Sequence, residues 1–179
     1  INVVLPVCRG GDGRLNAIDQ DCEHVLESVT FFELEPVEGA ARRRHLAADL
    51  ADRLRRARAL ADDFEAMLRE LADQRSAMLA ASEGEDERAE VAEFLGWLSR
   101  EHFVFFGLAV FGAPGSGEEP RRLGVFRLEK KPPRPEDAVG RRFLSRKRGG
   151  GPLLLVRKTE VESRVHRAGK VEEILVRSF

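Results

Sequence analysis

The stretch FLGWLSREHFVFFGLAVF, residues 94–111, changes its apolar period halfway along. Before the polar residues 99–102, apolar side chains recur every three or four residues, on one face of a predicted helix: Val91, Phe94, Leu95 and Leu98. From Phe103 onward the side chains are mostly β-branched or aromatic, a pattern typical of a largely buried strand. The stretch therefore predicts a helix that runs into a strand, with one core containing Phe94, Leu98, Phe103 and Phe105.

The residues that follow predict further strands, which we expect to join the same sheet. These strands are Leu123–Leu128, Leu153–Lys158 and Val171–Phe179, and a short helix is predicted near Glu136–Phe143.

The N-terminal residues predict two strands joined through a turn. Ile1–Cys8 is strand-like, and Pro6 favours an edge position or a bulge because proline has no N–H to donate. Arg9–Arg14 contains three glycines and is typical of a turn. Glu27–Glu35 predicts the second strand, which Pro36 ends.

A long helix is predicted from about Ala40 to Ala81. One continuous apolar stripe runs along it, and the opposite face is charged; the stripe consists of Leu46, Leu50, Leu54, Ala57, Ala61, Phe64, Leu68 and Leu71. Such a length is compatible with a coiled coil or a bridging helix. We favour a helix that lies on a sheet, with one break allowed, because the stripe is closer to a 3.6-residue than a 3.5-residue period.

The acidic segment Ser82–Glu87 predicts a boundary between two domains. Residues 1–81 form the first (strand, strand, long helix), and residues 85–179 form the second (helix followed by four strands). The predicted fold class is α+β, with small antiparallel sheets covered by helices and a long helix between the two units.

Composition excludes several classes of protein. The chain has 179 residues and a net charge of −1, which does not favour a polyanionic partner. No apolar run approaches the roughly 18 residues of a membrane span. The two cysteines lack metal-ligand spacing, so we expect reduced thiols and a cytoplasmic location. Because the chain begins at Ile1 inside a strand-like run, we expect it to be a piece of a longer protein.

The sequence predicts no catalytic, cofactor-binding or metal-ligating residues. Gly112–Gly117 resembles a phosphate-binding loop, but Glu118 and Glu119 stand where that loop needs Lys and Ser or Thr. No GxGxxG pattern follows a strand, and the four histidines have no metal-site spacing.

A basic segment, Arg121–Arg148, contains eleven Lys or Arg residues and three Asp or Glu residues. It could bind an anion, an RNA or an acidic neighbouring domain. Because no aromatic platform accompanies it, we favour a solvated loop or a docking surface.

A second group of cations surrounds the end of the strand Leu153–Lys158. It could hold the carboxylate or phosphate of an effector through Arg157, Lys158, Ser163, Arg164, His166 and Arg167. The alternative, which we favour, is that Arg164 and Arg167 pair with carboxylates on adjacent strands, namely Glu160, Glu162, Glu172 or Glu173.

Several of these segments together resemble the N-terminal region of the large bacterial NAD-specific glutamate dehydrogenases. FLGWLSREHFVFFG (94–107) is similar to the family pattern FLRWLxxxHFxFLG, and SRVHR (163–167) to S-x-VHR. DFEAM (63–67) occupies the place of DWxxM. Residues 1–15 resemble the pattern HPVLxVxRDxxGxL, and residues 27–35 resemble ESxxHIEID. The chain departs from these patterns at Leu5, Arg9-Gly10, Phe64 and Leu108, so a ligand role of the family's His or Tyr does not carry over.

The resemblance implies a fold and a role that composition does not. In this family the region consists of ACT-type and ACT-like α+β domains that precede the catalytic domain. An ACT unit has the order βαββαβ, so Ile1 would enter at its second strand and the first unit would be truncated. The implied role is regulation or oligomerisation without catalysis. NAD, glutamate oxidation and the Rossmann site would belong to the full-length enzyme.

The resemblance also implies partners: further copies of the chain, its own catalytic domain and an amino-acid effector, but neither nucleic acid nor membrane. The alternatives are a scaffold without a ligand, and an anion or nucleic-acid binder that uses Arg121–Arg148. We also expect self-association, through the N-terminal sheet or the apolar stripe of the long helix.

Overall fold

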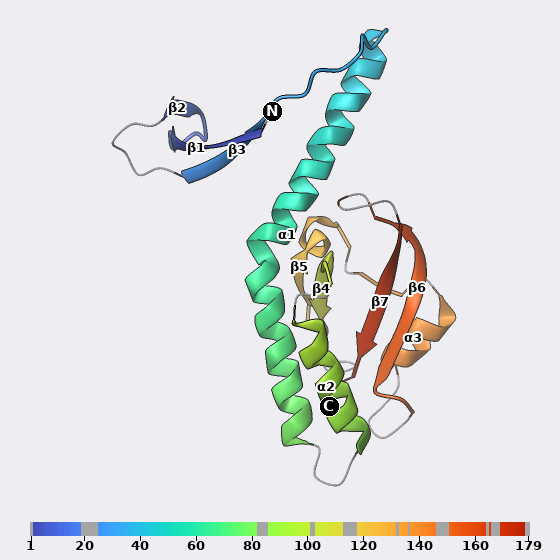
Figure 1. The fold of residues 1–179 in the computed structure, drawn as a ribbon. Helices are drawn as coiled ribbons and strands as arrows, with labels where there is room; N and C mark the ends of the chain where they lie inside the picture. Colours follow the sequence, from blue (N-terminus) through green and yellow to red (C-terminus); the bar gives the residue numbers. More distant parts are fainter. Residues whose placement is uncertain are drawn as a thin grey trace. The chain divides into compact units, whose positions relative to one another are not determined.

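The computed structural model describes residues 2–18, 25–81, 86–100, 103–112, 118–131, 133–135, 137–145, 151–163, 165 and 169–177. The chain divides into two compact units, residues 1–46 and 47–179, which we describe separately (Figure 1). The predicted fold class is confirmed: small antiparallel sheets and a long helix make an α+β structure. This arrangement is compatible with an ACT-like description.

The N-terminal unit contains a three-stranded antiparallel sheet in the order β2-β1-β3, formed by β1 (Asn2–Arg9), β2 (Leu15–Ile18) and β3 (Val25–Thr30). β1 is central, although Pro6 favoured an edge position or a bulge; the described irregularity of β1 lies at Cys8 and Arg9. Pro6 is tolerated because β2 pairs only with residues 7–9 of β1, so the described ladder at Pro6 has a partner on one side, Leu26. The short strand β2 was not predicted.

The turn after β1 forms as predicted. The Gly10 N–H donates to the Arg14 carbonyl over 2.9 Å, and Gly13 has φ +77°, which favours glycine. β3 ends at Thr30, opposite Asn2, so the prediction of a strand to Glu35 is wrong: β1 offers no described partner beyond that point.

Cys8 is disulfide-bonded, which contradicts the expectation of reduced thiols. Its bonding partner lies outside the described residues.

Helix α1 (Ala40–Ala80) is unbroken, although the prediction allowed one break, and its buried face is not the predicted stripe. The buried residues are Ala59, Leu60, Met67, Glu70, Leu71 and Met78. Of the predicted stripe only Leu71 is among them, and Leu54 is 60% exposed. The inner face is polar in part because Asp63 and Glu70 bind the strand that packs there, as described below.

The core of the second unit joins α1 to helix α2 (Asp86–Leu98). Leu71 and Met78 of α1 lie in one buried cluster with Leu153 and with four residues of α2, namely Val91, Ala92, Leu95 and Leu98. Half-buried apolar residues pack against this cluster, including Phe94, Phe103, Phe105, Leu108, Ile174 and Val176. The predicted core of Phe94, Leu98, Phe103 and Phe105 is therefore confirmed.

The four C-terminal strands form two hairpins rather than the single sheet we expected. β4 (Gly107–Val110) pairs with β5 (Arg121–Gly124), and β6 (Leu154–Glu162) pairs with β7 (Lys170–Val176). Apolar side chains of both hairpins pack against the same core, including Leu108 and Ile174, and no described strand pairs across the two hairpins.

β4 begins later than predicted, at Gly107, because the chain leaves the ladder there. Gly124, opposite Gly107, has φ +64°, and the 3-10 helix η1 (Val125–Leu128) follows it. The Val125 N–H donates to the Phe106 carbonyl over 2.8 Å, which closes the ladder. The prediction of a strand through Leu128 is therefore wrong.

Helix α3 (Ala138–Ser145) corresponds to the short helix predicted near residues 136–143. Its buried Phe143 lies under the guanidinium of Arg177, with Cζ 5.6 Å from the ring centroid. This contact joins α3 to the end of β7.

The compact units meet within α1, at residues 46 and 47, whereas the predicted domain boundary follows Ala81. The difference arises because the C-terminal half of α1 shares a core with α2. The assignment of residues 1–81 and 85–179 to two ACT-like domains stays a prediction.

We expect Leu95→Ala to lower the free energy of unfolding by about 2–5 kcal/mol, because it leaves a cavity where a 2% exposed side chain packed. The matched control is Leu79→Ala in α1, where the side chain is 44% exposed; its cost should be below about 1 kcal/mol. Urea unfolding followed by circular dichroism measures both. Equal losses at the two positions would contradict the core described above.

Candidate functional site

An open cleft of about 1830 Å³ lies within the second unit, beside the β4–β5 and β6–β7 hairpins. Apolar residues line it from both sides, among them Phe105, Leu108, Val110, Ile174 and Val176. The polar lining comes mainly from β6, β7 and residues 133–137 before α3. A concave, largely apolar surface with convergent polar groups is the usual form of a small-molecule site.

The charges that line this cleft are nearly balanced. Its described lining contains six Lys or Arg residues and seven Asp or Glu residues. A polyanion would meet as many carboxylates as cations, whereas a small zwitterion could pair with both kinds of group. The cleft therefore suits an amino acid better than a nucleic acid.

The structure brings three of the predicted effector contacts to the lining of this cleft: Arg157, Lys158 and Ser163. Arg164, His166 and Arg167 lie outside the described residues, and so do the ion pairs predicted for Arg164 and Arg167. Whether any of the six residues contacts an effector stays a prediction.

Arg157 is the centre of an ion triad that the sequence analysis missed. Its guanidinium contacts the carboxylates of Asp137 and Glu173, and the bond from Nε to Glu173 Oε2 is 2.6 Å. The hydrogen bond to Asp137 is the main cause that raises the pKa of Arg157, and Glu173 adds to it. Because two carboxylates already hold this cation, Lys158 has the more available charge.

Asp137 has a second role, at the start of α3. Its Oδ1 accepts the Gly140 N–H over 2.7 Å, as a capping carboxylate does. This bond, and then the contact with Arg157, hold the pKa of Asp137 below its usual range. A capping Asp followed by a helical pattern is a recognisable signal, but its partner on β6 has no sequence signature.

Gly140 makes the close approach of Arg157 to α3 possible. A Cβ at this position would lie 2.5 Å from Cβ of Pro135 and 2.6 Å from Nη2 of Arg157. Both distances are shorter than real Cβ contacts, so the triad requires glycine here.

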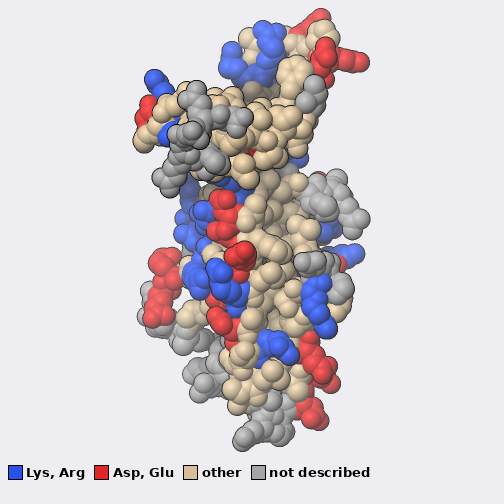
Figure 2. Space-filling model, turned by 60° about the vertical axis from the view of Figure 1, so that its left-hand side comes forward, with Lys and Arg blue, Asp and Glu red and all other residues tan. Residues whose placement is uncertain are grey.

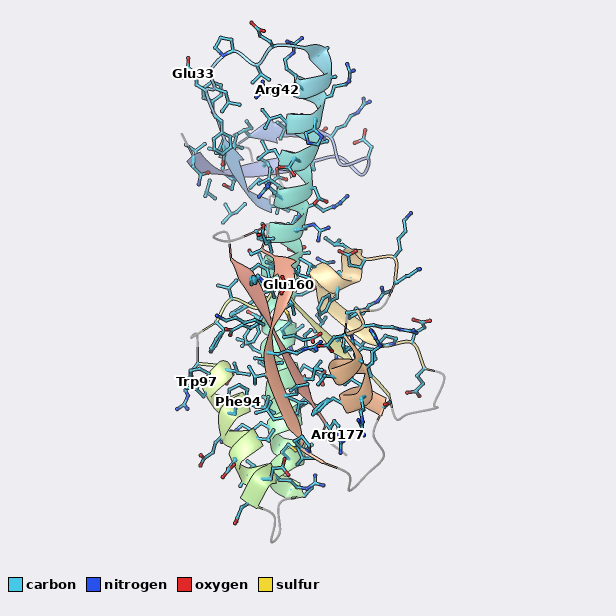
Figure 3. All side chains as sticks on the ribbon, turned by 90° about the vertical axis from the view of Figure 1, so that its right-hand side faces the viewer. Glu33, Arg42, Phe94, Trp97, Glu160 and Arg177 are labelled. Atoms are coloured by element: carbon cyan, nitrogen blue, oxygen red, sulfur yellow. The ribbon has the colours of Figure 1, made fainter. Side chains whose placement is uncertain are left out.

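The β6–β7 hairpin carries further opposite charges across its ladder. Lys158 lies opposite Glu172, and Lys170 Nζ contacts Glu160 Oε2 over 2.7 Å. Cross-strand pairing of the kind that we favoured therefore occurs, although between other residues. Figure 3 shows Glu160 and Arg177 at opposite ends of this hairpin.

The basic segment Arg121–Arg148 is not a continuous loop. It contains β5, η1 and α3, and its arginines contact acidic residues of α1. Arg121 Nη1 lies 3.1 Å from Glu70, and Arg127 Nε lies 2.9 Å from Asp63. Residues 132, 136 and 146–148 lie outside the described part of the segment. Two of the eight described cations of the segment therefore contact carboxylates of α1.

Aromatic rings cluster where α2 ends, within the stretch of residues 94–111. The Trp97 ring lies 5.7 Å from Phe94 and 4.9 Å from Phe103, edge to face with the latter. Figure 3 shows Phe94 and Trp97 together on α2. Phe103 also lines the cleft, so this cluster supports one of its walls.

The described residues contain no group of three His, Cys, Asp or Glu side chains that could hold a metal ion. Among the helices that the structure describes, none is long and apolar enough to cross a membrane.

We expect Asp137→Asn to lower the melting temperature at neutral pH, because the capping carboxylate and its ion pair are lost. The folded pKa of Asp137 is depressed, so its stabilisation is complete above the unfolded pKa of about 3.9 and is lost as pH falls through the folded value. The difference between wild type and variant should therefore shrink below about pH 4.

Thermal unfolding between neutral and acid pH measures this effect. Asp73→Asn, on an exposed part of α1, is the control and should change the melting temperature little. A difference for Asp137→Asn that stays constant down to strongly acid pH would contradict the assigned role.

Comparison with known proteins gives one informative match. An NAD-specific glutamate dehydrogenase from Halomonas elongata is 27% identical over 143 residues, which cover 72% of this chain. No protein-family model matches the chain, and no solved structure matches it significantly. The chain spans 9% of the length of this relative, so it is similar to a small part of an NAD-specific glutamate dehydrogenase.

Proposed function

We propose that this chain is a non-catalytic regulatory and oligomerisation segment of an NAD-dependent glutamate dehydrogenase, from the ACT-like region that precedes the catalytic domain. The similarity to the Halomonas elongata enzyme carries the proposal. The small antiparallel sheets with helices agree with it. NAD binding and glutamate oxidation would belong to the rest of such an enzyme, and the whole would work in the cytoplasm as a homo-oligomer.

The cleft beside the two hairpins is the proposed effector site. Its balanced charge and apolar walls fit a free amino acid, with Lys158 available to the carboxylate of that ligand. Arg157 would act as a positioning residue, because its triad fixes α3 against β6 and β7. Effector binding could then change how the two hairpins pack on their shared core.

Binding of nucleic acid is the weaker alternative. The arginines at positions 121 and 127 already contact carboxylates of α1. A scaffold without a ligand differs from our proposal only in whether the cleft binds an effector.

The purified chain should produce no NADH from glutamate and NAD, because its sequence contains no dinucleotide-binding pattern. Absorbance at the NADH band measures this, with a commercial glutamate dehydrogenase as the positive control. Turnover that scales with the concentration of the purified chain would contradict a non-catalytic role.

Calorimetry with a panel of free amino acids tests the effector site. We expect saturable heat for at least one amino acid, and Lys158→Gln should weaken that binding on the order of tenfold if it removes a charge-assisted contact. The control, Lys131→Gln, changes an exposed lysine that does not line the cleft. If no amino acid binds, the effector site is wrong and the scaffold role remains.

A further inference from the structure

The outer face of α1 carries an apolar stripe within the second unit that is exposed for most of its length, with Ala57 and Leu68 half-buried. We call it the outer stripe; it consists of Ala47, Leu50, Leu54, Ala57, Ala61, Phe64 and Leu68. Leu50 is 40% exposed, Leu54 60% and Phe64 37%. Figure 2 shows an uncharged band along this helix with charged side chains beside it. A continuous exposed apolar surface of this kind usually marks an interaction site, because ordinary solvent-facing surfaces of helices are polar.

The spacing of the outer stripe is that of a coiled-coil seam. From Ala47 to Leu68 the intervals alternate between three and four residues, which is the a and d pattern of a heptad. The core of this unit is formed mainly by another face of α1, through Leu60 and Met67, and it takes up the continuation of the stripe at Leu71.

We propose that the outer stripe is an interface with a second copy of this chain, in which the two α1 helices pack antiparallel. This inference rests on the assembly role proposed above, but not on the effector site. It names the surface, the partner and the relative direction of the helices.

The exposed charges beside the stripe determine the direction. Five of them lie on one flank in heptad positions e and b: Arg55 and Arg58 come first, Asp62 and Glu65 follow, and Arg69 lies just beyond Leu68, the last residue of the stripe. All five side chains are exposed. A parallel copy would place arginines beside arginines, whereas an antiparallel copy places the basic half of the flank beside the acidic half.

One register satisfies both the apolar and the charged residues. With the two-fold axis near residue 59, Leu54 lies level with Phe64 of the partner subunit, and Leu50 lies level with Leu68 of the partner subunit. Ala57 then lies level with Ala61 of the partner subunit, so small side chains at the centre allow close approach of the helices. On the flank, Arg55 comes beside Glu65 of the partner subunit. The two copies of Arg58 come close to each other near the axis, and each also lies beside Asp62 of the partner subunit.

The existing contacts of these charges are compatible with the pairing. Asp62 also accepts from Arg127 over 3.1 Å, and Glu65 lies 3.6 Å from Arg69 in its own helix. Carboxylates can accept from two cations, so these contacts need not break. The pairing is isologous: each helix offers the same surface to the other, as closed two-fold dimers require.

Sedimentation equilibrium of the full 179-residue chain at several concentrations tests the proposal. We expect the mass to rise with concentration from that of a 20.0 kDa monomer to that of a dimer. Leu54→Ser should raise the dimer dissociation constant on the order of tenfold or more, since truncated apolar side chains at an interface centre dominate binding losses. Leu79→Ser, on the same helix beyond the proposed overlap, should leave the dissociation constant unchanged.

A charge exchange tests the direction of the helices. Arg55→Glu and Glu65→Arg should each weaken the dimer, and the double variant R55E/E65R should restore it, because in an antiparallel pair the two exchanged positions meet. Circular dichroism of every variant checks that α1 stays folded. A dimer without this restoration would contradict the antiparallel arrangement.

Two results would overturn the interface. A monomer at every concentration would remove both the interface and the proposed assembly role, while amino-acid binding in the cleft would still be measured separately. A dimer that survives Leu54→Ser but dissociates on Val29→Ser would place the contact on the N-terminal sheet, where Val29 is exposed. That result would retain the assembly role and contradict the stripe.

Discussion

The carboxylate of Asp63 holds the second unit together at the point where strand, turn and long helix meet. Its Oδ2 accepts the Gly124 N–H over 2.7 Å and lies 2.9 Å from Arg127 Nε. Two features require glycine at position 124. Its φ is positive, and a Cβ there would lie 2.7 Å from the Phe106 carbonyl oxygen. Without a carboxylate at position 63, the half-buried N–H of this turn would lack its acceptor. The turn from β5 into η1 thus depends on α1.

The same contact explains the short motif DFEAM on α1. Asp63 binds the turn, and Met67, fully buried, packs inside the unit. Phe64 lies between them in sequence but on the outer face, so a Phe in place of the family's Trp does not disturb the core. The two ends of the motif therefore both have structural roles in this unit.

Local patterns predicted most of the elements, and contacts distant in sequence decided where the predictions failed. The helix-to-strand change at residues 98–103 was readable because the apolar period itself changes there. The end of the β4–β5 ladder could not be predicted from the local pattern. Gly124 leaves the ladder where its N–H binds Asp63, which is 61 residues away in the sequence. The triad of Arg157 was missed for the same reason: Asp137 and Glu173 meet only after α3 has packed on β6 and β7.

The sequence also misassigned the faces of α1, for a physical reason. An apolar stripe normally predicts the buried face of a helix, since burial of large aliphatic side chains is favourable. Here the inner face instead combines Met67, Leu71 and Met78 with the carboxylates of Asp63 and Glu70, so its apolar character is interrupted. A hydrophobicity pattern cannot reveal that Arg121 and Arg127 compensate these carboxylates.

This division of faces leaves the first half of α1 with little support from its own chain. No side chain of residues 40–58 is fully buried. These residues are stabilised by helix propensity, by pairs such as Arg53–Asp49 and Arg56–Asp52, each worth only a few tenths of a kcal/mol, and by the contact of Arg56 with Glu129 over 3.2 Å. The largest apolar side chains of that half, Leu50 and Leu54, remain 40% and 60% exposed. A reversed second helix would bury them, and its macrodipole would oppose that of the first. Assembly would therefore stabilise the part of α1 that the monomer supports least.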